Sequence, residues 1–140
     1  MAEHTVKAFD EDITRLRGLI AEMGGLAELA IEEGMRALVR GDEALSQEVV
    51  ARDKKLDALE SEVDAMAVRT LALRAPMADD LREIVAALKI GGVIERIGDY
   101  AKNIAKRVNR IKDRSRFEPL TLIPAMAEFA AEMVHDVLTA

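Results

Sequence analysis

Two carboxylate side chains and one amide side chain are spaced four residues apart near the end of a long segment with a helical pattern. Glu95, Asp99 and Asn103 therefore share one face of a helix. Like charges at this spacing destabilise a helix by about 0.3 kcal/mol, so a bound cation would explain the placement. Carboxylate and amide oxygens suit Mg²⁺ or Mn²⁺, or iron in carboxylate-rich sites. The alternative is a solvated face whose acids pair with neighbouring Arg and Lys side chains.

A second acidic row lies on the preceding helical segment. It has carboxylates at steps of three and four: Asp53, Asp57, Glu60 and Asp64. If this edge faces the third segment, carboxylates from two helices can share a metal cluster. The alternative is again a solvated flank, with Lys54 and Lys55 as local counter-charges. We expect Glu95 and Asp99 themselves to point away from the bundle core, towards solvent or a partner.

Basic residues crowd the chain after the acidic motif. They are Lys102, Lys106, Arg107, Arg110, Lys112, Arg114 and Arg116. Cations near a helix C-terminus complement the helix dipole, which accounts for part of the excess. The remainder could meet an anionic membrane surface, an acidic partner or phosphate.

Other reactive constellations are scarce. Glu132 and His135 have the Glu-x-x-His spacing of di-iron bundles, but such sites need two of these motifs and the sequence has one. Gly91 and Gly92 lie inside a helical pattern, not between a strand and a helix, so they do not form a phosphate-binding loop. The sequence therefore gives no support for enzymatic catalysis.

The composition excludes several further classes. The 140 residues include no Cys, so neither a disulfide framework nor a thiolate zinc site can form. No apolar run approaches the roughly 18 residues that a membrane-spanning helix needs. A net charge of −6 and only 3% aromatic residues argue against a nucleic-acid binder.

Apolar residues recur at steps of three and four along most of the chain, which predicts helices. Asp42 is the expected N-cap of the second helix, and Pro76 ends that helix because proline disfavours helix at the residue before it. The connections between the first three helices are short, so neighbours must be antiparallel. We predict an all-α fold, an antiparallel up-down-up three-helix bundle with an additional C-terminal helix. The expected helices cover about 6–41, 42–74, 77–113 and 124–140.

The third predicted helix carries two apolar stripes that point to nearly opposite sides. The first contains Leu81, Ile84, Val85 and Leu88, and the second contains Ile90, Ile94, Ile97, Ala101, Ile104, Val108 and Ile111. The stripes exchange sides at Gly91 and Gly92. Either the helix bends at these glycines, or something beyond the three-helix core covers its first half.

The chain contains four separated motifs in the order found in the PhoU family of phosphate-signalling proteins. It closely resembles this family up to about residue 113. The motifs are HTVKAFDE at 4–11, MGGL at 23–26, RAPMADDLR at 74–82 and ERIGD at 95–99. The resemblance implies two similar three-helix bundles, each with an acidic motif that binds a metal cluster, reported as iron or zinc. Carried over, Glu95 and Asp99 are the metal-binding pair, with Asp53, Asp57 and Asn103 as weaker candidates for completing the site.

The resemblance also implies a role and a domain organisation. It implies a cytoplasmic negative regulator of the phosphate-starvation response, peripheral to the membrane, which couples the phosphate ABC transporter ATPase to a sensor histidine kinase by binding both. Residues 1–113 would form one bundle, 114–119 a linker, and 120–140 the first helix of an incomplete second repeat. An apolar face left exposed on that last helix favours a homodimer or a helix-exchanged oligomer.

Two other classes of function stay open. One is a carboxylate-bundle enzyme, or a metal-binding or metal-storage protein. The other is a purely structural helical oligomer, for which the long heptad patterns are the evidence.

Overall fold

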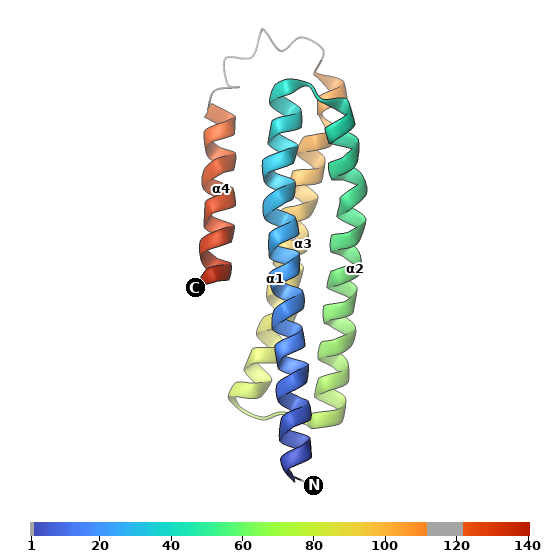
Figure 1. The fold of residues 1–140 in the computed structure, drawn as a ribbon, viewed down its shortest axis with the longest axis vertical. Helices are drawn as coiled ribbons and strands as arrows, with labels where there is room; N and C mark the ends of the chain where they lie inside the picture. Colours follow the sequence, from blue (N-terminus) through green and yellow to red (C-terminus); the bar gives the residue numbers. More distant parts are fainter. Residues whose placement is uncertain (1, 112–121) are drawn as a thin grey trace.

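The computed structural model describes residues 2–111 and 122–140. Its helices are α1 (Ala2–Arg40), α2 (Glu43–Arg74), α3 (Asp79–Lys106) and α4 (Leu122–Thr139), and a 3-10 turn, η1 (Val108–Arg110), follows α3. The first three pack as an antiparallel bundle, and α4 lies beside α1 on the side away from α2 (Figure 1). The predicted all-α architecture is confirmed. No helix in the described ranges has the length and apolar content that crossing a bilayer requires.

Local sequence signals account for both junctions of the bundle. Gly41 ends α1 with a positive φ of 68°, where glycine is favoured, and the side chain of Asp42 accepts a hydrogen bond from the backbone N–H of Leu45 at 3.0 Å. At the second junction Ala75 has φ 42° and Ala78 has φ 52°, on either side of Pro76. The predicted cap and the predicted break are therefore confirmed, although α3 begins at Asp79, two residues later than expected.

The third helix ends earlier than the expected Asp113. Regular α-helix stops at Lys106, and the chain tightens into η1, a common ending for a helix. The tighter turn keeps the Val108 side chain buried in a small apolar cluster with Met35, Ala37 and Leu38. Side-chain packing at this end of the bundle therefore decides the boundary. Residues 112 and 113 lie outside the described ranges, as does the predicted linker at 114–119.

A single buried stripe runs along α3, where the sequence pattern indicated two. It consists of Ile84, Gly91, Ile94, Gly98, Ala101 and Ala105. The predicted stripes divide its larger residues, with Ile84 in the first and Ile94 and Ala101 in the second, because the glycines that connect them carry no hydrophobic signal. In contrast, Ile90, the first residue of the second predicted stripe, is 45% exposed. The helix is continuous through both glycines of the expected change-over.

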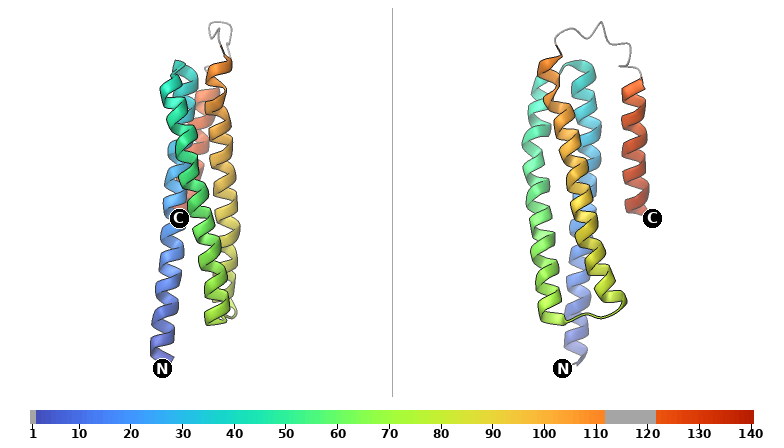
Figure 2. Two further views of the ribbon diagram at one scale, coloured as in Figure 1. Left: turned by 90° about the vertical axis from the view of Figure 1, so that its right-hand side faces the viewer. Right: turned by 180° about the vertical axis from the view of Figure 1, so that it is seen from behind.

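The three helices enclose one main apolar cluster, in which Met23 and Ile84 have no exposed surface. Viewed from behind, α3 crosses α1 obliquely, so its N-terminal end lies towards α4 and its C-terminal end lies beside α2 (Figure 2). Ion pairs between exposed and half-buried side chains accompany the α1 contacts: Arg15–Glu62, Lys55–Glu22, Arg74–Asp12 and Arg52–Glu33 to α2, and Arg17–Glu83 to α3. Exposed pairs of this kind contribute about 0.5 kcal/mol each, so apolar burial dominates the stability.

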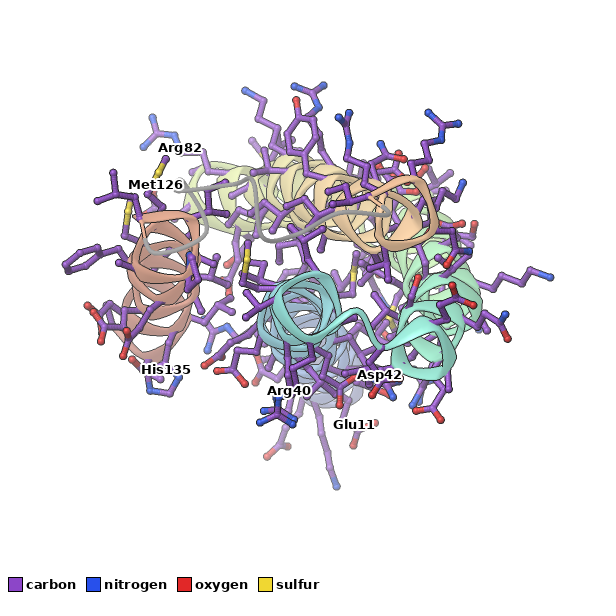
Figure 3. The ribbon with its side chains drawn as sticks, turned by 90° about the horizontal axis from the view of Figure 1, so that it is seen from above. Glu11, Arg40, Asp42, Arg82, Met126 and His135 are labelled. Carbon is purple, nitrogen blue, oxygen red and sulfur yellow. The ribbon has the colours of Figure 1, made fainter. Side chains whose placement is uncertain are left out.

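Helix α4 packs on α1 and leaves much of its own surface exposed. Ala131 is buried, and Leu138 fills the space over Gly24, where a Cβ atom would lie 2.0 Å from its Cδ1 atom. Met126 and His135 project from opposite sides of the helix (Figure 3). On the Met126 side, an apolar groove separates α4 from α3; its lining includes Ile97, Tyr100, Ile104, Met126, Ala130 and Met133. We call this the α3/α4 groove.

The contact at Gly98 yields a test of the packing between α2 and α3. A Cβ atom at this position would lie 2.2 Å from Cδ2 of Leu56, which is only 2% exposed. We expect Gly98→Ala to lower the free energy of unfolding by about 1–3 kcal/mol, because overpacking outweighs the gain in helix propensity. Urea denaturation followed by circular dichroism measures the change.

Gly92→Ala is the matched control. It lies in the same helix, and a Cβ atom there would have no neighbour within 4 Å. The free energy of unfolding of this variant should rise by up to about 1 kcal/mol, because alanine has the higher helix propensity. Equal effects of the two substitutions would contradict the close approach at Gly98.

Candidate metal centre

The acidic edges of α2 and α3 face each other in the bundle. Asp53 on α2 is buried, and Asp99 on α3 is half-buried. The Nζ atom of Lys102 lies between them, 2.8 Å from Oδ2 of Asp53 and 2.9 Å from Oδ1 of Asp99. A metal cluster shared by two helices requires the acidic edge of α2 to face α3, and the structure has this arrangement.

Close packing at Gly98 brings these groups together. The position that a Cβ atom of Gly98 would occupy is 3.4 Å from Oδ1 of Asp53. Because no side chain stands there, Leu56 can pack directly against the backbone of α3. The carboxylates that flank this contact on the two helices then converge on one edge of the bundle.

Glu95 lies half-buried within the influence of four other carboxylates. Burial raises its pKa above the ordinary value, and the negative charges of Asp99, Glu60, Asp57 and Asp53 raise it further. Each of these effects disfavours the ionised form of Glu95. The site therefore holds more negative charge than its own cations neutralise.

Asp57 shows the same electrostatic pattern with one opposing contribution. Asp57 is exposed, but the loss of solvent around its carboxyl group and the charge of Asp53 raise its pKa, Lys102 lowers it, and Asp99 raises it. The net shift is upward, so the ammonium of Lys102 does not compensate the surrounding carboxylates. We call the group of Asp53, Asp57, Glu60, Glu95 and Asp99 the α2/α3 carboxylate cluster.

The donor set of this cluster fits a hard cation, because carboxylate oxygens are the ligands that Mg²⁺, Mn²⁺ and iron prefer. Within the described ranges, however, no three carboxylate or imidazole groups are placed together closely enough to hold one ion. Lys102 occupies the space between Asp53 and Asp99 instead. A bound metal would therefore require the Lys102 side chain and the neighbouring carboxylates to adjust.

The expectation that Glu95 and Asp99 point away from the bundle core is wrong. They flank the buried Gly91, Ile94, Gly98 stripe and lie along the edge facing α2. The orientation follows from the glycines, which turn this side of α3 towards α2. Asn103, one helical turn beyond Asp99, is exposed.

Lys102 also lies elsewhere than expected, because it belongs to the acidic cluster and not to the exposed basic patch. The signal available in the sequence was its i, i+3 spacing from Asp99. Lys106, Arg107 and Arg110 are exposed as expected. The other predicted members of the patch, Lys112, Arg114 and Arg116, lie outside the described residues.

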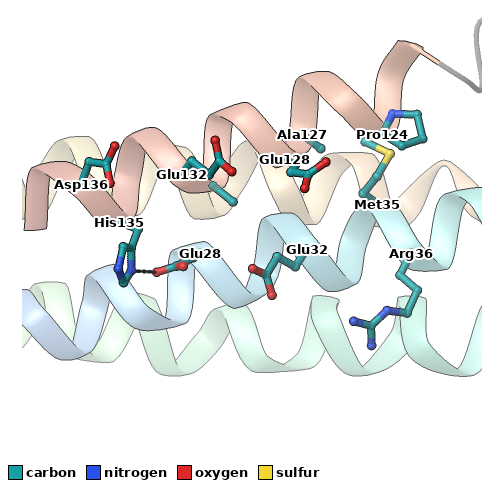
Figure 4. A pocket seen from close by; sticks show the side chains of 11 residues that line it. Glu28, Glu32, Met35, Arg36, Pro124, Ala127, Glu128, Glu132, His135 and Asp136 are labelled. Atoms are coloured by element: carbon teal, nitrogen blue, oxygen red, sulfur yellow. Dashed lines mark ion pairs between the residues drawn. The ribbon is translucent and has the colours of Figure 1, made fainter. Parts of the chain in front are cut away.

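A second acidic groove, absent from the sequence predictions, separates α1 from α4. It is lined by Glu28 and Glu32 from α1 and by Glu128, Glu132 and Asp136 from α4 (Figure 4). His135 Nδ1 lies 3.4 Å from Oε2 of Glu28. The sequence pattern indicated only the Glu132 and His135 pair. The α1 residues that line the same groove are about a hundred residues away in the chain, so no local spacing connects them to this pair.

The raised pKa of Glu95 predicts a pH-dependent cost to the metal-free fold. The fold binds the Glu95 proton more tightly than the unfolded chain does, so the cost is present above the folded-state pKa and disappears as the pH falls towards 4.5, the ordinary value. Glu95→Gln should therefore raise the free energy of unfolding at pH 7 by about 0.5 kcal/mol, with chelator present. The gain should vanish near pH 4.

Urea titrations at several pH values measure this difference. Glu48→Gln makes the same charge change at an exposed position of α2 outside the cluster. A stabilisation by Glu95→Gln that does not exceed that of Glu48→Gln at pH 7 would contradict the crowding of charge described above.

Comparisons with known proteins agree with this architecture. The chain is 50% identical over 137 residues to the phosphate-specific transport system accessory protein PhoU homolog of Zymomonas mobilis, covering 98% of this chain and 58% of that protein. It is 44% identical over 141 residues to the homolog of Caulobacter vibrioides, covering 100% of this chain and 61% of the relative. The chain thus spans about three-fifths of the length of these relatives.

A solved structure and a family profile complete the comparison. The crystal structure of PhoU from Pseudomonas aeruginosa superposes with a TM-score of 0.90 at 30% identity, covering 94% of this chain and 64% of that one. The profile described as PhoU domain matches residues 20–108, which include α2, α3 and the carboxylate cluster. The chain therefore belongs to the PhoU family.

Proposed function

We propose that this chain works in phosphate-specific transport as a regulatory accessory protein that acts by binding and not by catalysis. The observation that carries the proposal is its identity of 50% and 44% to relatives named as phosphate-specific transport accessory proteins. The proposed role is negative regulation of the phosphate-starvation response. In this role the protein couples the phosphate ABC transporter ATPase to the phosphate-sensing histidine kinase, at the cytoplasmic side of the membrane.

We further propose that the α2/α3 carboxylate cluster binds metal. Glu95 and Asp99 are the principal ligands, and Asp53 and Asp57 complete the site from α2. Asn103 is a weaker candidate because its side chain is exposed. The oxygen-only donor set of these residues favours iron, Mn²⁺ or Mg²⁺ over zinc, which prefers nitrogen and sulfur ligands.

The metal would supply positive charge that joins α2 to α3. Burial and the charges of neighbouring carboxylates raise the pKa of Asp57 and of Glu95 in the metal-free cluster, so a multivalent cation has unfavourable repulsion to relieve. Binding would stabilise the edge of the bundle that carries the cluster. This is a structural role, in which no ligand needs to exchange protons or electrons.

Two surfaces are suited to partners. The exposed cations Lys106, Arg107 and Arg110 could meet an acidic protein surface, and the α3/α4 groove offers apolar side chains such as Met126 and Met133. The same groove favours self-association, as a homodimer or by exchange of α4. The purely structural oligomer is the alternative that this groove supports.

The metal proposal predicts a loss of binding without loss of fold. The Glu95→Ala, Asp99→Ala double variant should retain less than about a tenth of the Mn²⁺ or iron bound by the parent protein, because it removes two of the proposed ligands. Elemental analysis after dialysis against the metal measures occupancy, and circular dichroism should show unchanged helix content.

Glu48→Ala with Asp64→Ala is the matched control, since both carboxylates are exposed on α2. This variant should bind metal as the parent does. Unchanged metal content in the Glu95, Asp99 double variant would show that the cluster is not the site.

The partner proposal predicts retention on two baits. The transporter ATPase and the cytoplasmic region of the histidine kinase, each immobilised, should retain the protein from a purified mixture. A triple Lys106→Glu, Arg107→Glu, Arg110→Glu variant should bind at least one of them about tenfold more weakly, because it reverses the exposed charges. Retention by neither bait would leave the structural oligomer as the better interpretation.

A further inference from the structure

Lys102 is the one cation that the structure brings into contact with the α2/α3 carboxylate cluster among the described residues. Its side chain is 22% exposed, and its ammonium contacts one carboxylate from each helix. The Asp53 side chain is 6% exposed, whereas that of Asp99 is 44% exposed. The ammonium thus spans the interface between a buried group and an accessible one.

The metal-free fold depends on this ammonium. A buried carboxylate without a counter-charge is costly, and removing one partner of such a pair leaves the other uncompensated. Hydrogen bonds to Asp53 and Asp99 raise the pKa of Lys102 above its ordinary value, which shows that the surroundings favour its charged form. Lys102 therefore serves as the resident cation of the site.

We infer that Lys102 is an internal competitor for the metal, an ammonium that must leave Asp53 and Asp99 before both carboxylates can hold an ion. The inference rests on the proposed function, since it concerns the same metal site. The argument is steric and electrostatic, because the oxygens that Lys102 occupies are oxygens the ion would use. The four-carbon stem of lysine allows its head to swing into solvent while the backbone of α3 stays in place.

Competition of this kind sets both the affinity and the selectivity of the site. A monovalent ion gains little by replacing an ammonium of equal charge. A divalent or trivalent ion brings additional charge to a cluster that has an excess of carboxylates. The ammonium thus keeps the fold intact without metal and raises the threshold at which metal binds.

Substitution of Lys102 by a neutral residue of similar length tests the inference. In the full chain, Lys102→Met should bind Mn²⁺ about tenfold more tightly than the parent protein, measured by isothermal titration calorimetry. Lys106→Met makes the same charge change one turn further along α3, at an exposed position, and should change the affinity less than about twofold. Lys102→Arg keeps the positive charge and should not reproduce the gain.

A second readout separates competition from a merely structural role. With chelator present, Lys102→Met should melt at a lower temperature than the parent, because Asp53 loses its partner. Added Mn²⁺ should then raise its Tm by more than it raises that of the parent. A structural role alone would lower the Tm without this larger rescue.

A further pair of variants keeps the inference testable if Lys102→Met does not fold. Asp53→Asn with Lys102→Met removes both members of the buried pair, and Asp53→Asn alone is its reference. Tighter Mn²⁺ binding by the double variant than by Asp53→Asn supports competition, and equal binding contradicts it.

The outcomes distinguish this inference from the proposed function. If the parent protein binds Mn²⁺ through Glu95 and Asp99, and Lys102→Met binds it with equal affinity, the competition is overturned and the metal site stands. If neither the parent nor Lys102→Met binds Mn²⁺, iron or zinc, the proposed metal site fails, and the inference fails with it.

Discussion

The close approach of α2 and α3 at Gly98 is the contact on which the candidate site depends. Leu56 occupies the space that any larger side chain at Gly98 would need. Helices pack at such short range only where one of them presents very small residues. Because the carboxylates of both helices flank this contact, the packing that stabilises the bundle also concentrates negative charge along one edge.

This concentration of negative charge lowers the stability of the fold but supplies oxygen ligands for a cation. Burial, together with repulsion among the carboxylates, raises the pKa values of Asp57 and Glu95, so their ionised forms destabilise the fold at neutral pH. Lys102 offsets part of this repulsion through Asp53 and Asp99. An apolar edge would be more stable, but it would lack oxygen ligands. The bundle thus gives up stability at the edge that carries the proposed metal site.

Helix α4 extends the molecule without joining its core. Its small residues face α1, where Ala131 is buried and Leu138 covers Gly24, while Met126, Phe129 and Met133 remain largely exposed. The result is two grooves of opposite character beside one helix, acidic towards α1 and apolar towards α3. An exposed apolar surface of this kind is typical of an interaction site.

The amino-acid sequence is sufficient to predict the helices, the capped junction at Asp42, the break at Pro76 and the i, i+4 spacing of Glu95 and Asp99. Each of these depends on residues within a few positions of one another, so local preferences and helical periodicity are sufficient. The packing of the helices determines which side of α3 is buried, places Lys102 between Asp53 and Asp99, and brings Glu28 to His135. These depend on contacts between residues far apart in the chain, and on glycines whose small size carries no hydrophobic signal but permits the closest packing.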